Sequence, residues 1–192
     1  MSSNIERIIR QAQQGKSEAI STLYEMHADA IYRYIFYRVP TTEDAEDLTA
    51  EVFLRMVEGL PQYNYKGIPF EAWLYRISAA RIADFYRRTK RRPQTELSDM
   101  LRDQEALPEE QIQQNEEIET LRQALQQFSD EEQTILILRF LERKSHKEVG
   151  SILGKTANAV KAAQHRALIQ LAAILGSEEK ARHYLRGDHD EV

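Results

Sequence analysis

The sequence predicts an all-α protein made of two small helical domains joined by an acidic linker. Apolar residues recur at three- and four-residue intervals along most of the 192 residues, and we find no convincing alternation of the kind that marks a β-strand. About 42% of the chain is hydrophobic, which is enough to fill small cores. Residues 93–116 lack this periodicity and separate a predicted domain over 1–92 from a second over 117–176, which a polar tail over 177–192 follows.

The predicted N-terminal domain contains four helices, and a loop with the sequence PQYNYKG joins the third to the fourth. The third helix carries an apolar stripe formed by Leu48, Val52, Met56 and Leu60, with Phe53 beside it. The helix boundaries follow from capping and helix-breaking residues, which are Ser3, Gly15, Ser17, Pro40, Thr41 or Thr42, and Pro69.

Charge is distributed unevenly, although the formal total is only −5. The end of the fourth helix, from Arg81 to Arg92, has six basic residues against the single acid Asp84. The following stretch, residues 93–116, reverses this balance with seven acids against Arg102, and it holds two prolines. The modest net charge therefore hides a basic cluster followed by an acidic tether, and it does not argue against a nucleic-acid partner.

The C-terminal domain contains a predicted helix-turn-helix. Capping boxes start helices at Ser129 and Ser145, Gly154 interrupts the chain, and Thr156 caps a last long helix. Residues 133–171 carry seven basic residues against two acidic ones, which is the charge expected of a surface that contacts phosphates. An ordinary helical hairpin with a solvated basic face is the alternative. The predicted DNA-contacting residues are Thr156, Asn158, Lys161, Ala162, His165 and Arg166.

Aromatic and basic residues alternate between Tyr63 and Arg92. Aromatic rings flanked by cations can stack on unpaired bases and follow a phosphate backbone. A loop containing Tyr65 and Gly67 can also receive a flipped base. The alternative is that Phe70 and Trp73, at helical spacing, belong to the core of the domain.

The third helix begins with a run of acidic residues. Asp44, Asp47 and Glu51 share one face, which suggests either a carboxylate metal site or a surface for docking a protein. We favour the docking surface, because no histidine lies nearby and acidic residues also suit the positive end of a helix dipole.

Several classes of function are excluded by what the sequence lacks. It has no cysteine, its five histidines show no metal-ligand spacing, and it contains no phosphate-binding loop or nucleophile motif. We therefore expect neither enzymatic activity nor a metal or cofactor. The longest apolar run is Leu171–Leu175 and the N-terminus lacks a secretory signal, so we expect no membrane insertion and a cytoplasmic location.

Three segments, in their order, resemble the sigma factors of the extracytoplasmic-function (ECF) type, which direct bacterial RNA polymerase to promoters. These are EDAEDLTAEVFLRMVEGL, GIPFEAWLYRISAARIADFYRR and ERKSHKEVGSILGKTANAVKAAQHRALIQL. The resemblance implies that the helix-turn-helix contacts the minus-thirty-five element. It implies polymerase docking by Asp47, Leu48, Glu51, Val52 and Phe53. It implies capture of the melted minus-ten element by Tyr63, Tyr65, Lys66, Gly67, Ala80, Arg81, Asp84, Arg87 and Arg88.

The partners that the resemblance implies are core RNA polymerase, promoter DNA and an anti-sigma factor. Many relatives carry Asn where Ala80 stands, and Ser-Arg where Ala162 and Ala163 stand, so the promoter sequence does not transfer from a relative. One alternative is a conventional helix-turn-helix regulator with a helical sensor or dimerisation domain, which would bind duplex DNA without polymerase. Another is a helical adaptor or inhibitor that does not contact DNA.

Overall fold

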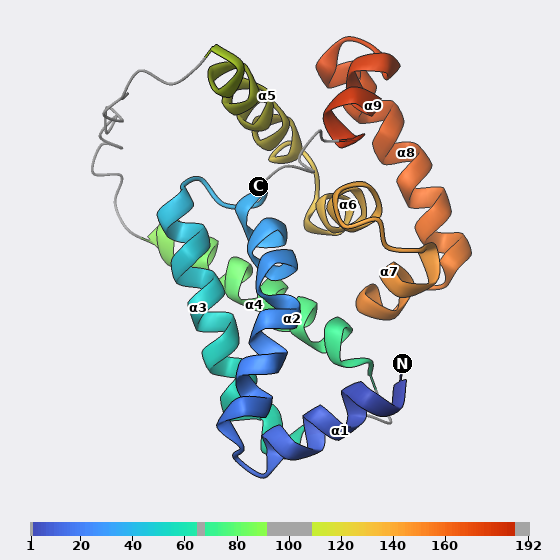
Figure 1. The fold of residues 1–192 in the computed structure, drawn as a ribbon. Helices are drawn as coiled ribbons and strands as arrows, with labels where there is room; N and C mark the ends of the chain where they lie inside the picture. Colours follow the sequence, from blue (N-terminus) through green and yellow to red (C-terminus); the bar gives the residue numbers. More distant parts are fainter. Residues whose placement is uncertain (1, 65–67, 92–108, 187–192) are drawn as a thin grey trace.

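The computed structural model describes residues 2–64, 68–91 and 109–186, and within these ranges every regular element is a helix, as the sequence predicts (Figure 1). The elements in chain order are α1 (Ser2–Gln13), α2 (Ser17–Phe36), α3 (Thr42–Gly59), the short 3₁₀ helix η1 (Leu60–Gln62), α4 (Phe70–Arg91), α5 (Glu109–Leu125), α6 (Asp130–Leu136), the π-helical turn η2 (Ile137–Leu141), α7 (His146–Leu153), α8 (Ala157–Leu175) and α9 (Glu178–Arg186). In the described ranges no helix is both long enough and apolar enough to cross a membrane.

The N-terminal domain is a bundle in which α2, α3 and α4 pack on one another and α1 crosses the end of the bundle (Figure 1). Leu23 and Ile31 of α2, Val52 of α3 and Leu74 of α4 are fully buried in its core. The start of α3 follows the sequence prediction, because the Thr41 side chain accepts a hydrogen bond from the Asp44 backbone N–H at 3.0 Å.

Several boundaries differ from the sequence prediction. Helix α1 begins at Ser2, so Ser3 lies inside the helix and does not cap it. Ser17 is the first helical residue of α2 and not its cap, a position that Lys16 takes without a side-chain hydrogen bond. The linker predicted over 93–116 is also too long, because its last eight residues, 109–116, belong to α5. Glu and Gln have good intrinsic helix propensity, so a stretch of them continues a helix that the packing of Leu121 and Leu125 anchors. The remainder of the predicted linker lies outside the described residues.

The C-terminal domain packs α6 and α7 against the long helix α8, and η2 packs on α6, α7 and α9. The chain that follows α8 forms the amphipathic helix α9, where a polar helix or a frayed tail was expected. Ala181 and Leu185 of α9 are buried, and α9 packs on α8, η2 and α5. The tail is therefore part of the domain over the described residues 178–186.

Candidate nucleic-acid interface

The turn between α7 and α8 is fixed by local interactions that the sequence predicts. The Ser145 side chain and Glu148 form a reciprocal capping box at the start of α7. Gly154 ends α7 in the left-handed conformation with φ of 68°, and the Thr156 hydroxyl accepts from the Ala159 backbone N–H at 3.2 Å to start α8. These caps fix where α7 ends and where α8 begins, on either side of the turn.

A second glycine in this motif, Gly150, allows α7 to approach the turn closely. Its carbonyl accepts a hydrogen bond from the Lys155 N–H at 2.8 Å. A Cβ at this position would lie 2.5 Å from the Lys155 carbonyl oxygen, which is closer than real contacts allow. We did not single out Gly150 from the sequence, where it stands inside a helical pattern with no turn signal beside it.

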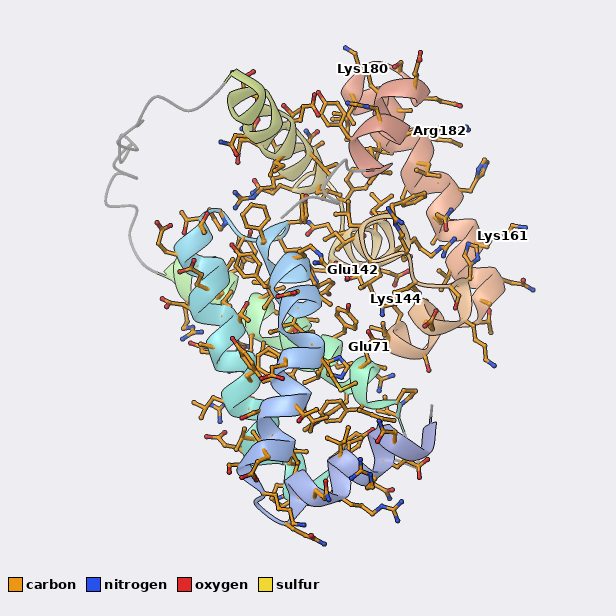
Figure 2. All side chains as sticks on the ribbon, viewed as in Figure 1. Glu71, Glu142, Lys144, Lys161, Lys180 and Arg182 are labelled. Carbon is orange, nitrogen blue, oxygen red and sulfur yellow. The ribbon has the colours of Figure 1, made fainter. Side chains whose placement is uncertain are left out.

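The N-terminal half of α8 separates a buried face from an exposed one. Val160, Ala163 and Ala167 face the core. Every residue predicted to contact DNA in this segment is exposed, and Figure 2 shows the Lys161 side chain extending away from the domain. These exposed residues are Thr156, Asn158, Lys161, Ala162, His165 and Arg166. The face is therefore free to enter a groove of duplex DNA.

Gln164 fixes the orientation of α8 from its partly buried side. Its side-chain oxygen lies 2.9 Å from Arg139 Nε of η2 and 2.9 Å from His146 Nε2 of α7. One amide thus ties the recognition helix to two other elements. Sequence reasoning missed Gln164 because its partners are 18 and 25 residues away, and periodicity does not report such contacts.

The C-terminal half of α4 carries the basic residues predicted to hold melted DNA. Asp84 binds two of them, Arg81 at 2.5 Å and Arg87. Arg88 lies 3.6 Å from Glu51 of α3, so the predicted minus-ten surface and the predicted docking surface meet at this pair. Ala80, Arg87 and Arg88 are exposed. The carboxylates limit the local positive charge and hold the guanidinium groups in place.

The loop between α3 and α4 is held at both ends by hydrogen bonds. Tyr63 packs on Trp73 and donates its hydroxyl to the Ile68 carbonyl at 2.6 Å. From α1, the Gln13 amide donates to the carbonyls of Leu60 at 3.0 Å and Tyr63 at 2.8 Å. The Tyr63 ring is thus part of the scaffold. The other three predicted residues of the loop, Tyr65, Lys66 and Gly67, lie outside the described residues.

Burial corrects one part of the docking prediction. Leu48, Val52 and Phe53 lie in the core at 0 to 6% exposure, where they join α3 to its neighbours, so they cannot present a surface to a partner in this conformation. Their helical stripe is the one that the sequence already marked as apolar. Asp47 and Glu51 lie on the outer side of α3, exposed and half-buried respectively. The large apolar side chains that α3 exposes are Leu54 and Val57, which sequence reasoning did not select.

The acidic start of α3 shows no metal geometry. Asp44 accepts a hydrogen bond from the Thr41 hydroxyl at 2.8 Å, which is a capping contact. Across the described ranges, no group of three histidine or acidic side chains is arranged to hold an ion.

Comparison with known proteins agrees with this division into two domains. Two family models match the chain, "Sigma-70 region 2" over residues 23–92 and "Sigma-70, region 4" over residues 124–173. The ECF RNA polymerase sigma factor BldN of Streptomyces coelicolor is 32% identical over 181 residues, which are 93% of this chain and 69% of that protein.

Two solved structures share the fold. CnrH, in complex with the cytosolic domain of CnrY, superposes with a TM-score of 0.68 at 21% identity, covering 88% of this chain and 95% of that one. The sigma factor RpoE from Bartonella quintana, in complex with the anti-sigma factor NepR, superposes with a TM-score of 0.59 at 16% identity, covering 81% and 96%.

Proposed function

This chain belongs to the ECF sigma factors of the sigma-70 family, and from that membership we propose which of its surfaces perform each step of promoter recognition. It is a transcription initiation factor that binds core RNA polymerase and directs it to promoters, and it is not an enzyme. The chain recognises DNA and docks on polymerase, and the polymerase performs the chemistry.

The observation that carries the assignment of surfaces is that one chain presents two separate cationic faces. One is the exposed N-terminal half of α8, with Lys161 and Arg166. The other is the C-terminal half of α4, with Arg87 and Arg88. A conventional regulator needs only the first of these, whereas a sigma factor must also hold melted DNA.

We assign the α8 face to the minus-thirty-five element. Basic side chains there contact phosphates and base edges in the major groove. Ala162 sits at the centre of this face and can pack against a thymine methyl group. The substitution Ala162→Ser should therefore weaken the preference of the protein for thymine at one base pair of the minus-thirty-five element. An unchanged base preference would contradict this contact.

We assign the α4 face and the adjoining loop to the melted minus-ten element. Unpairing a base costs a few kcal/mol, which stacking and pocket contacts to the captured base offset. Arg81, Arg87 and Arg88 would follow the backbone of the captured strand. Asp84 would keep two of these guanidinium groups oriented before DNA arrives.

Docking on core polymerase is assigned to the outer face of α3, through Asp47 and Glu51. Leu48, Val52 and Phe53 would support that face from the core. We further propose that the protein acts in the cytoplasm with RNA polymerase, and that an anti-sigma factor is among its partners, as for the RpoE structure described above.

Run-off transcription from a genomic fragment library, with purified core polymerase, tests the proposal. The wild-type chain should co-elute with core polymerase and produce discrete new start sites. Lys161→Ala with Arg166→Ala should abolish those starts without loss of co-elution, whereas Lys180→Ala, which removes another exposed lysine, should retain them (Figure 2). Binding to duplex DNA without polymerase, as a symmetric dimer, would favour the conventional regulator instead.

A further inference from the structure

Helix α9 adds to the C-terminal domain an element that neither sigma-70 model covers, since the region 4 match ends at residue 173. Gly176 ends α8 in the left-handed conformation with φ of 88°, which turns the chain back. The Ser177 hydroxyl then accepts a hydrogen bond from the Lys180 backbone N–H at 3.0 Å. Helix α9 therefore lies beside the C-terminal half of α8 (Figure 1).

Contacts with the rest of the domain hold α9 in place. Ala181 and Leu185 are buried and fix its inner face. The His183 imidazole lies 3.4 Å from the Glu117 carboxylate of α5. Arg182 stands between these residues in the sequence, and its side chain is 67% exposed. The packing of α9 thus presents the Arg182 guanidinium to solvent from an anchored helix.

Arg182 borders the surface that is predicted to read DNA. Side chains of α8 and α9 line a groove of about 100 Å³, and these are His165, Leu168, Ile169, Glu178, Ala181 and Arg182. His165 belongs to the face of α8 that we assign to the minus-thirty-five element. Figure 2 shows Lys161 and Arg182 along the same outer edge of the C-terminal domain, whereas Lys180 extends away from α8.

Helix α8 has no charge of its own at this level. After Arg166, its residues up to Leu175 include no acidic or basic side chain. Ile169, which shares the groove with Arg182, is exposed, but its side chain cannot bind a phosphate. Arg182 is therefore a cation that α9 supplies where the charged part of α8 ends.

This level of α8 matches the border of the groove that its N-terminal half would enter. At a rise of about 1.5 Å per residue, Ile169 lies about 12 Å along α8 from Lys161 and about 6 Å from His165. The major groove of B-DNA is about 12 Å wide, and the phosphates of the two strands border it. When the first turns of α8 lie against base edges, the turn that contains Ile169 is therefore level with the bordering phosphates.

The ion pair that Arg182 already forms does not prevent a contact with DNA. Its Nη2 atom lies 3.7 Å from the Glu178 carboxylate, and both side chains are exposed. Exposed ion pairs contribute little to stability. A phosphate can therefore replace Glu178 as the partner, and Glu178 keeps the guanidinium beside the groove until DNA binds.

We propose that Arg182 binds a backbone phosphate at the border of the minus-thirty-five element, so that α9 extends the DNA-binding surface of the C-terminal domain. This inference rests on the proposed function, because it uses the placement of α8 in the major groove. A guanidinium forms two parallel hydrogen bonds with phosphate oxygens, and its charge is permanent. The contact adds affinity and fixes the register of α8 on the duplex, but it reads no base.

The salt dependence of duplex binding by the full chain tests this contact. The probe is a fluorescein-labelled duplex with the sequence upstream of a start site mapped by run-off transcription, and anisotropy follows its binding between about 50 and 200 mM salt. Arg182→Gln should weaken binding about five- to tenfold and reduce the slope of log affinity against log salt by about 0.9, the value for one phosphate. Arg182→Lys, which keeps the charge, should retain the slope. Lys180→Ala is the matched control on the same helix and should bind as the wild type does.

Neutral phosphates identify the contact directly. A methylphosphonate removes the charge of one phosphate, and a series of duplexes places it in turn at each phosphate that borders the minus-thirty-five element. At one or two adjacent positions it should weaken wild-type binding about fivefold. It should leave the affinity of Arg182→Gln unchanged there, because that variant already lacks the partner. If every position weakens the wild type and Arg182→Gln alike, the contact is overturned.

A second pair of variants separates this inference from the proposed function. If the run-off assay yields no start sites, or if Lys161→Ala with Arg166→Ala keeps the wild-type affinity for the duplex, the proposed function fails and the Arg182 contact falls with it. If that double variant loses affinity while Arg182→Gln binds as tightly as Lys180→Ala, the proposed function stands and the Arg182 contact alone is overturned.

Discussion

The guanidinium of Arg38, in the segment between α2 and α3, lies 2.9 Å from the Asp130 carboxylate at the start of α6. The two residues belong to different domains and are 92 residues apart in the sequence. Arg38 is buried and its partner is not, so the ion pair forms the rim of a hydrogen-bonded cluster that also includes Tyr34, Gln133 and Thr134. This relationship makes the stability of one domain depend on the position of the other.

Replacement of Arg38 should therefore destabilise the whole chain. Arg38→Met leaves the Gln133 side-chain oxygen and the Tyr34 hydroxyl oxygen without their buried donor, and we expect the free energy of unfolding to fall by about 2–4 kcal/mol. Arg38→Lys should recover only part of this, because one ammonium group cannot match the fork geometry of the guanidinium. Urea denaturation measures both variants, and Arg10→Met at an exposed site should change little. If Arg38→Met lowers the free energy of unfolding no more than Arg10→Met does, the cluster does not couple the domains.

The helix-turn-helix should not tolerate a methyl group at Gly150. Gly150→Ala places a Cβ 2.5 Å from the Lys155 carbonyl, so the turn between α7 and α8 must shift. We expect a loss of about 1–3 kcal/mol in stability and weaker binding to minus-thirty-five duplex DNA, as measured by fluorescence anisotropy. Single-stranded minus-ten DNA, which we assign to the other domain, should bind as before. Ser151→Ala at the next, exposed position is the control, and a Gly150→Ala variant with the same duplex affinity as this control would contradict the prediction.

Stability should fall as the pH drops below about 6.5, in part because of His27. Burial beside Phe70 lowers the pKa of His27, the Glu71 carboxylate opposes this, and the Lys144 ammonium adds to it. Because the pKa is lower in the folded chain than in the unfolded chain, the unfolded chain binds the proton more tightly. The stability linked to His27 is therefore complete above the unfolded pKa and is lost as the pH falls through it.

Urea denaturation at pH 7.5 and pH 5.5 tests this assignment. The free energy of unfolding should fall less between pH 7.5 and pH 5.5 in the His27→Gln chain than in the wild-type chain. In the His165→Gln chain, which changes an exposed position of α8, it should fall as much as in the wild-type chain. An unchanged pH dependence in the His27→Gln chain would assign the effect to other groups.

The fold was predictable from the sequence wherever local chemistry decides it. Thr41, Ser145 and Thr156 cap their helices as predicted, because a cap depends on residues two or three positions away. The stripe of Leu48 and Val52 was also visible as apolar. Its assignment to docking came from the family resemblance, which identifies the helix but does not say which of its faces is buried.

The contacts between distant segments were not predictable. Arg33 and Glu142 are 109 residues apart, and no pattern in the sequence pairs them. The sequence left open whether the free chain holds its domains together or apart, and only the structure shows the contacts that join them. Gln164 and Gln13 were missed for the same reason, because the carbonyls and side chains that an amide meets are set by the tertiary fold.

Gln13 should matter for promoter melting, although it lies in α1 and outside the segments that match the sigma-70 models. Its amide donates to the Leu60 and Tyr63 carbonyls, so it anchors the start of the loop that precedes α4. Gln13→Ala removes two hydrogen bonds worth about 0.5–1.5 kcal/mol each, and we expect open-complex formation to slow by about tenfold while binding to minus-thirty-five duplex DNA is unchanged. The fluorescence of 2-aminopurine in the minus-ten element reports the melting step. Gln13→Glu should not rescue the rate, because a carboxylate cannot donate to a carbonyl. Gln14→Ala, the exposed neighbour, should melt DNA at the wild-type rate, and a Gln13→Ala rate equal to this control would show that α1 does not position the loop.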